Sequence, residues 1–203
     1  MHKIETKGSR EKKQRRNRII SGAILVVIML LSTAGYSIMD KNSSQSQQPS
    51  GEQYNGFKFL KTGNGWQLQN QSYTLSTAYL PTDAQNVSYT ASLSSGFFLA
   101  KEVYFSALDD ESRIAANEIG RNLPALRVQL ACLEEQANMT ECLSLPVKTC
   151  KDILIVIRGK TAGSSEFVHS RVYQQENCIY IEAETKNLIK AADRLLFGLY
   201  SVM

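Results

Sequence analysis

Apolar and polar side chains alternate in the stretch from residue 57 to residue 79. In "FKFLKTGNGWQLQ" the alternation runs on both sides of an Asn-Gly pair, and "SYTLSTAYL" repeats it further along the chain. A period of two is the pattern of a β-strand with one buried face. Asn-Gly accepts the positive φ angles of a tight hairpin turn, so we expect a turn at Asn64–Gly65. The pattern predicts a three-stranded antiparallel meander, with a further short strand at 87–93.

Downstream of residue 101 the period changes from strand to helix and back. "EVYFSAL" at 102–108 predicts a short apolar strand, and 109–123 has helical spacing with acidic residues in its first turn. Asp109 or Asp110 is the expected N-cap, because a short acidic side chain accepts hydrogen bonds from free backbone N–H groups there. Another strand is expected at 127–133, and a strand, a helix and a strand in this order predict a βαβ unit. The apolar face of the helix comprises Ile114, Ala115, Ile119 and Leu123.

The last third of the chain holds two continuous apolar runs and a helical stripe. "DILIVIRG" at 152–159 and "NCIYIEA" at 177–183 are typical of buried strands. A polar, cysteine-bearing loop is expected at 134–149, and Thr185 is a candidate cap for the final helix. The stripe of that helix comprises Leu188, Ala192, Leu195, Leu196 and Leu199. We therefore predict an α+β or α/β domain: a mixed β-sheet with an antiparallel meander and two covering helices.

A basic segment leads into a long apolar run at residues 19–39. These 21 residues carry no formal charge, and about 20 apolar residues cross the hydrocarbon core of a bilayer as a helix. Lys and Arg residues before the run favour a cytoplasmic N-terminus. The most apolar part is shorter, and small residues follow it at 32–34, which also fits a cleaved signal peptide. We favour the retained single-pass transmembrane helix, and both interpretations export the rest of the chain.

This topology divides the chain into four parts. Residues 1–18 are the basic cytoplasmic tail, 19–39 the transmembrane helix, 40–53 a flexible linker rich in Ser and Gln, and 54–203 the exported domain. The positive charge is confined to the start, because residues 41–203 hold 15 of the 23 basic and 16 of the 19 acidic residues. A nearly neutral domain argues against a nucleic-acid partner.

All four cysteines lie in the exported part: Cys132, Cys142, Cys150 and Cys178. An even number of cysteines in an exported domain predicts disulfides. We favour Cys132–Cys142 with Cys150–Cys178. The pairing Cys132–Cys178 with Cys142–Cys150 remains open. Possible N-glycosylation sites, each the first residue of an N-x-[ST] triplet, are Asn42, Asn70, Asn86 and Asn138.

The chain lacks a sequence motif that identifies a chemistry. No C-x-x-C pair indicates a zinc or redox site, and no G-x-S-x-G accompanies His169, which we expect to be an exposed or edge-strand residue. The acidic run at 108–113 lacks the spacing of a calcium loop and is explained by a helix start. We therefore expect no catalytic residue, metal or cofactor.

The apolar start, the "YNGFKF" opening and the ending "NCIYIEAETKNLIKAADRLLFGLYSVM" resemble uncharacterised single-pass membrane proteins of archaea. The resemblance implies an archaeal cell-surface location and no activity. We expect a membrane-anchored extracellular module that binds or supports another envelope or membrane protein, in an unknown oligomeric state. The alternatives are an exported hydrolase that uses dispersed carboxylates, and a subunit of a secretion or pilus-like assembly.

Overall fold

The structure, a computed structural model, describes residues 51–70, 72–160 and 169–203 together with Ile20, Ile24, Val26 and Met29. Those four residues belong to the predicted transmembrane segment, and each is helical and exposed. The rest of that segment, the tail at 1–18 and nearly all of the linker lie outside the described residues. Among the residues described, no helix is both long and apolar enough to span a bilayer. Residues 49–203 form one compact unit, to which the following description applies.

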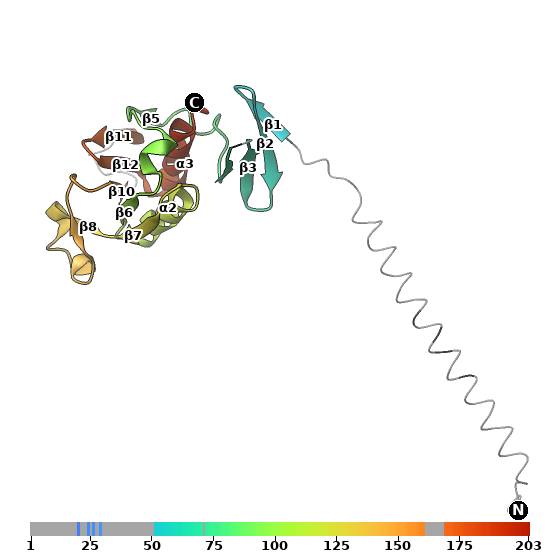
Figure 1. Ribbon diagram of the computed structural model, residues 1–203, viewed down its shortest axis with the longest axis horizontal. Helices are drawn as coiled ribbons and strands as arrows, with labels where there is room; N and C mark the ends of the chain where they lie inside the picture. The colour runs from blue at the N-terminus through green and yellow to red at the C-terminus, as the bar shows by residue number, and fades with distance from the viewer. Residues whose placement is uncertain are drawn as a thin grey trace, which may run out of the picture. The chain divides into compact units, whose positions relative to one another are not determined.

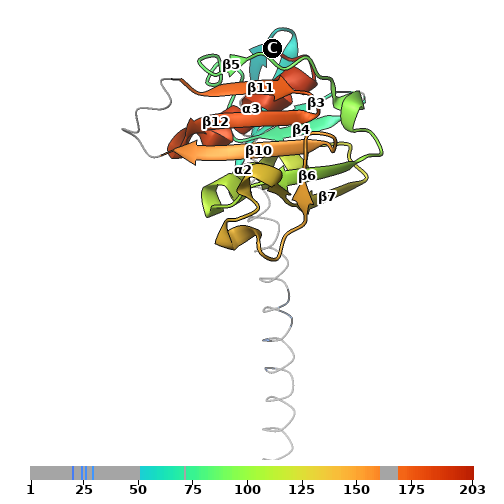
Figure 2. The ribbon, with the colours of Figure 1, turned by 90° about the vertical axis from the view of Figure 1, so that its left-hand side faces the viewer.

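A six-stranded mixed sheet is the centre of this unit, with the strand order β5-β11-β12-β10-β6-β7 (Figure 2). β12, β10, β6 and β7 run parallel to one another, while β11 is antiparallel to β12. The parallel pair β6 and β7 is joined through helix α2, so the predicted βαβ unit is confirmed. The strands are β5 (Ser88–Tyr89), β6 (Glu102–Ser106), β7 (Arg127–Leu130), β10 (Leu154–Lys160), β11 (Arg171–Gln175) and β12 (Cys178–Glu184).

A separate four-stranded antiparallel sheet contains the predicted meander. Its strands are β1 (Gly51–Tyr54), β2 (Phe57–Thr62), β3 (Gly65–Gln69) and β4 (Thr74–Thr77). The first strand begins three residues before the expected domain start, inside the segment assigned to the linker. β5 is also shorter than the strand predicted at 87–93. β11 was missed, because "RVYQQ" has only two apolar residues.

Two helices lie between the two sheets (Figure 1). They are α2 (Asp110–Gly120) and α3 (Leu188–Leu199). The predicted stripe of α3 is wholly buried, and Phe59 of β2 meets Phe197 edge-to-face at 6.1 Å. Asp109 caps α2, as predicted, by accepting from the backbone N–H of Ser112 at 2.7 Å. The fold is therefore α+β, with the helices covering one face of the mixed sheet.

Two helix predictions were wrong in detail. Ile114 is exposed because it points away from the apolar face on which Ala115 and Ile119 are buried. Thr185 does not cap α3; its hydroxyl donates to the carbonyl of Lys160 at 3.2 Å and thereby joins β10 to the start of a 3-10 turn. The short 3-10 turns are η1 (Ser95–Phe98), η2 (Glu134–Gln136), η3 (Thr140–Cys142) and η4 (Thr185–Asn187).

The segment expected to be a loop at 134–149 has local structure of its own. β8 (Cys132–Leu133) pairs in parallel with β9 (Val147–Lys148), and the turns η2 and η3 lie between them. The disulfide Cys132–Cys142 closes this segment, with 5.8 Å between the Cα atoms. Figure 1 shows it projecting from the side of the mixed sheet that faces away from the helices.

Candidate functional site

The free edges of the two sheets are protected to very different degrees. At β4, the side chain of Asn122 bonds to both backbone groups of Ser76, accepting from its N–H at 2.9 Å and donating to its carbonyl at 2.8 Å. β5 has only two residues, and β1 presents the polar sequence "GEQY". β7 has four residues, and among the described residues no strand pairs with its outer side. An unprotected edge is a template for pairing with another chain.

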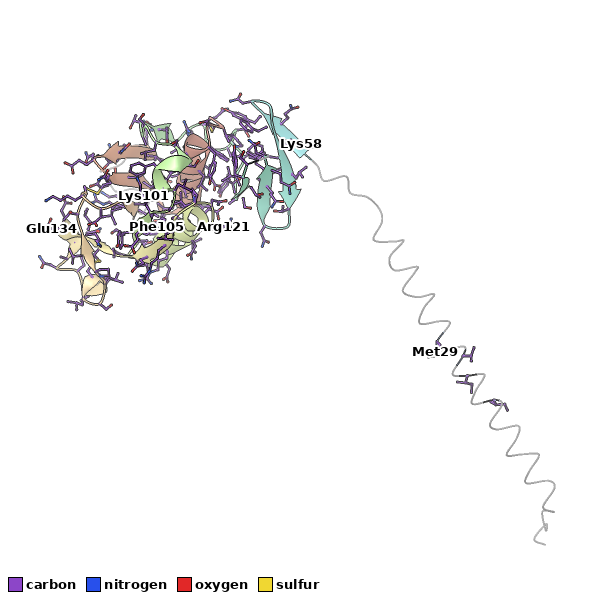
Figure 3. All side chains as sticks on the ribbon, viewed as in Figure 1. Met29, Lys58, Lys101, Phe105, Arg121 and Glu134 are labelled. Carbon is purple, nitrogen blue, oxygen red and sulfur yellow. A yellow bond between two sulfur atoms is a disulfide. The ribbon has the colours of Figure 1, made fainter. Side chains whose placement is uncertain are left out.

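Apolar side chains are exposed along this edge. Leu126, which immediately precedes β7, is 73% exposed, Val128 is 42% exposed and Leu130 is 39% exposed. β7 and the neighbouring face of α2 enclose a hollow of about 600 Å³. We call this hollow the β7 groove; its lining includes Phe105, Arg113, Ala116, Gly120, Arg121 and Val128. Figure 3 labels Phe105 and Arg121.

The face of the mixed sheet opposite the helices carries a polar cluster centred on Glu182. This side chain is almost fully buried, and its carboxylate accepts from Arg171 Nε at 2.7 Å and from the hydroxyl of Tyr173 at 3.1 Å. Arg158 Nη1 lies 3.7 Å from the same carboxylate. The three charged residues occupy one row of the sheet, because Glu182 is in register with both arginines. A buried charge held in this way is compensated, which is a structural role.

Two tyrosines extend the cluster along the same face. Tyr173 stacks on Tyr180 with ring centroids 5.0 Å apart, and Arg158 lies over the ring of Tyr180. Burial raises the pKa of both hydroxyls, and the neighbouring carboxylate of Glu182 raises the pKa of Tyr173 further. Both tyrosines therefore stay protonated at neutral pH and act as hydrogen-bonding groups.

A second, open cleft of about 810 Å³ lies at the carboxyl ends of β6 and β10. Ligands of open α/β sheets bind at such ends, so this cleft is where the carboxylates of a hydrolase would be sought. Asp109 is occupied in capping α2. Glu135 lies 3.7 Å from Arg158, and Glu141 accepts from Thr140 at 3.1 Å.

None of these three acids is buried. A hydrolytic acid depends on burial to raise its pKa. Among the described residues, no group of three or more His, Cys, Asp and Glu side chains is placed to hold a metal ion. The exposed apolar side chains make the β7 groove the candidate binding site of this domain.

The four predicted cysteines form two disulfides. Cys132 bonds to Cys142, and Cys150 bonds to Cys178 with 5.0 Å between the Cα atoms, so the favoured pairing is the one found. The second bridge attaches the segment before β10 to the start of β12. Two disulfides are consistent with an oxidising, extracellular environment.

Of the remaining predicted residues, only Asn138 borders one of the two hollows, and Asn42 lies outside the described part of the chain. His169 is exposed and does not line the groove or the cleft. Asn70, Asn86 and Asn138 are exposed, and Asn138 lies at the rim of the cleft. Asn42 lies outside the described residues. Sequence analysis missed the β7 groove, although the apolar residues of "LRVQL" are a signal that could have indicated an exposed edge.

Comparison with known proteins found no matching family model, no matching curated protein and no matching solved structure.

Proposed function

We propose that the chain is a membrane-anchored extracytoplasmic module that binds another envelope or membrane protein through the β7 groove. The observation that carries this proposal is the outer edge of β7, which has no strand partner in the part of the chain that the structure describes and where three apolar side chains are exposed beside an apolar hollow. A monomeric protein normally blunts such an edge, and an exposed apolar patch on an ordered element is typical of an interaction site.

The proposed location rests on three properties of the chain. The apolar run at 19–39 has the length of a transmembrane helix, and the basic residues before it favour a cytoplasmic N-terminus. The two disulfides favour an oxidising compartment for the domain. The resemblance to archaeal single-pass membrane proteins supports a cell-surface location, where the exposed sequons would be accessible to glycosylation.

Site-specific photo-cross-linking in the native membrane tests this function. A photoreactive amino acid is placed at Leu130 on β7, and in a control protein at Gln175, an exposed residue of β11. We expect a cross-linked adduct of defined mass from position 130 alone, which a charged residue at Val128 abolishes. Absence of an adduct, or equal adducts from both positions, would contradict partner binding at this edge.

A further inference from the structure

We propose that the β7 groove accepts an extended segment of its partner in which two acidic side chains flank an apolar one, added to the mixed sheet as a further strand. This inference rests on the proposed function and specifies the chemistry of the segment that is bound. It follows from three features of the groove: the backbone edge, the small residues of its wall and the sign of its charges.

The backbone of β7 supplies the first part of the recognition. As the last strand of the sheet, it leaves one side of its backbone without a strand partner among the described residues. A peptide that pairs with such an edge gains main-chain hydrogen bonds, while pockets for alternate side chains select its sequence. The exposed side chains of Val128 and Leu130 would then pack against apolar residues of the added strand.

Small residues on α2 make room for an apolar side chain. Ala116 and Gly120 line the groove on the helix side. A Cβ atom built on Gly120 would lie 3.6 Å from Cγ1 of Val128, an ordinary van der Waals contact. A larger side chain at position 120 would therefore extend into the space between α2 and β7. The groove depends on this position remaining small.

The charged residues that line the groove are both arginines, Arg113 and Arg121. Their side chains are about half exposed. Arg113 lies 3.4 Å from Asp110, which is itself highly exposed, and Arg121 bonds to Glu118 through Nη2. The pair Arg113–Asp110 is exposed and therefore weak. Glu118 is buried, so Arg121 compensates its charge, but it does so through Nη2 alone. Since a guanidinium group has five N–H donors, others remain on Arg121 for a partner. Both arginines can thus also bind carboxylates of a partner.

The spacing of the arginines gives the spacing of the acids. Arg113 on α2 and Arg121, the C-cap residue of the same helix, are eight residues apart, which corresponds to about 12 Å along a helix axis. Four residues of a strand span about 13 Å, and residues at even spacing share one face. The bound segment is therefore acid-x-apolar-x-acid, with the apolar side chain directed between the two arginines toward Ala116, one helical turn before Gly120.

The charge also argues against a second copy of this chain as the occupant. A symmetric pairing of two β7 strands would bring a second Arg113, Arg121 and Arg127 to the same edge. Like charges placed opposite one another destabilise an interface. An acidic partner segment compensates these charges, so the groove is better suited to a different protein.

Peptide binding to the full-length, oxidised protein in a mild nonionic detergent tests the inference. The probes are two fluorescent, end-blocked heptapeptides, Thr-Glu-Thr-Val-Thr-Glu-Thr and the same sequence with Lys in place of both Glu residues, and fluorescence anisotropy gives the Kd. We expect the acidic peptide to bind at least about tenfold more tightly at low salt, with the difference shrinking as salt is added. The variant Arg113→Glu, which breaks only a pair with the exposed Asp110, should remove this preference.

Substitutions at Gly120 provide the matched control. Gly120→Leu should abolish binding by filling the groove, whereas Gly120→Ala, whose added methyl group makes only an ordinary contact, should retain it. Equal binding of the two peptides, or binding of neither, would overturn the inference. If position 130 still cross-links to a partner in that case, the proposed function stands and only the acidic strand is wrong. If cross-linking fails as well, both are wrong.

Discussion

Asn122 replaces a neighbouring strand at the edge of β4. Its side-chain amide accepts from and donates to the backbone of Ser76, and it also donates to the carbonyl of Glu118 at 2.8 Å. The hydroxyl of Tyr200 donates to the backbone carbonyl of Asn122. Asn122, a buried residue just after the end of α2, therefore links three elements: the β4 edge of the meander, helix α2 and the C-terminal end of helix α3.

Replacing Asn122 with Ala should lower the free energy of unfolding by about 2 kcal/mol, because it leaves the backbone groups of Ser76 without their partner. Urea denaturation of the oxidised protein measures this change. Asn117→Ala, an exposed position on the same helix, is the control and should change stability by less than about 0.5 kcal/mol. Similar changes in the free energy of unfolding for the two variants would show that the edge of β4 does not depend on the hydrogen bonds of Asn122.

Asp193 is fully buried on α3, and its Oδ2 accepts from the backbone N–H of Tyr79 at 2.8 Å. Burial raises the pKa of this carboxyl well above 3.8, its ordinary value, and the backbone N–H groups of Tyr79 and Ala78 only partly oppose the increase. The charges that face it are Glu118 of α2, which raises the pKa, and Arg121 at the C-cap of α2, which lowers it. At pH values between the ordinary and the raised pKa, Asp193 therefore keeps its proton in the folded state, whereas the unfolded chain has lost it.

The stability that this proton contributes is fully present below about pH 4 and is lost as the pH rises through the raised pKa. We expect Asp193→Asn to show a smaller decrease in the free energy of unfolding between about pH 4 and about pH 7 than the unsubstituted protein. Denaturation at a series of pH values measures the difference. Asn117→Ala, an exposed substitution that removes no titratable group, is the control and should leave the pH profile unchanged. Parallel profiles for Asp193→Asn and the unsubstituted protein would contradict this account.

At the scale of elements, the hairpin turns show how far local sequence predicts this fold. The first Asn-Gly pair, Asn55–Gly56, forms the two-residue turn between β1 and β2, with φ angles of 47° and 83°. The turn predicted at Asn64–Gly65 is displaced by one residue, since Thr62 pairs with Gly65 and the loop is Gly63–Asn64. Asn-Gly therefore marks a hairpin at both positions. It occupies the two loop residues only at Asn55–Gly56, whereas at Asn64–Gly65 the loop lies one residue earlier.

Gly65 is required by tertiary packing. Its φ angle is 148°, and a Cβ atom there would lie 2.3 Å from the carbonyl oxygen of Thr77 on the adjacent strand β4. We expect Gly65→Ala to cost about 3 kcal/mol, from backbone strain and displacement of β4. Gly63→Ala is the matched control, because a Cβ atom at Gly63 meets nothing within 4 Å. Thermal denaturation measures the Tm of both variants. An equal decrease of the Tm in the two would contradict the tertiary role of Gly65.

Strands with a clear period and helices with a continuous stripe could be predicted, because each depends on local spacing. The βαβ unit and the stripe of α3 are examples. The apolar residues of "LRVQL" could indicate an exposed edge, but the β7 groove itself could not be predicted. It depends on which strand ends at the sheet edge and on Gly120 lying opposite Val128. The cluster around Glu182 also required the register of β10, β11 and β12, which brings residues far apart in sequence into one row.

At the scale of the whole molecule, the two faces of the mixed sheet have different roles. The helices and the meander cover one face and contribute most of the apolar core. The other face carries the second, smaller core, which includes Cys178 and Tyr180, beside the disulfide-bonded segment (Figure 1). The domain therefore depends on its bridges mainly on the side without helices, where the apolar core is smaller.

The intact mass of the native protein, isolated from membranes and alkylated with and without prior reduction, tests the organisation of the whole chain. We expect a mass that includes residues 1–34, because the apolar run extends past 32–34 to Met39 and has the length of a bilayer-spanning helix. Four alkyl groups should be added only after reduction, one for each cysteine. A chain that begins near Gly35 would show that the run is a cleaved signal, and the domain would then reach its partner without an anchor. Alkylation without reduction would remove the argument for an oxidising compartment, since the bridges would be absent from the native protein.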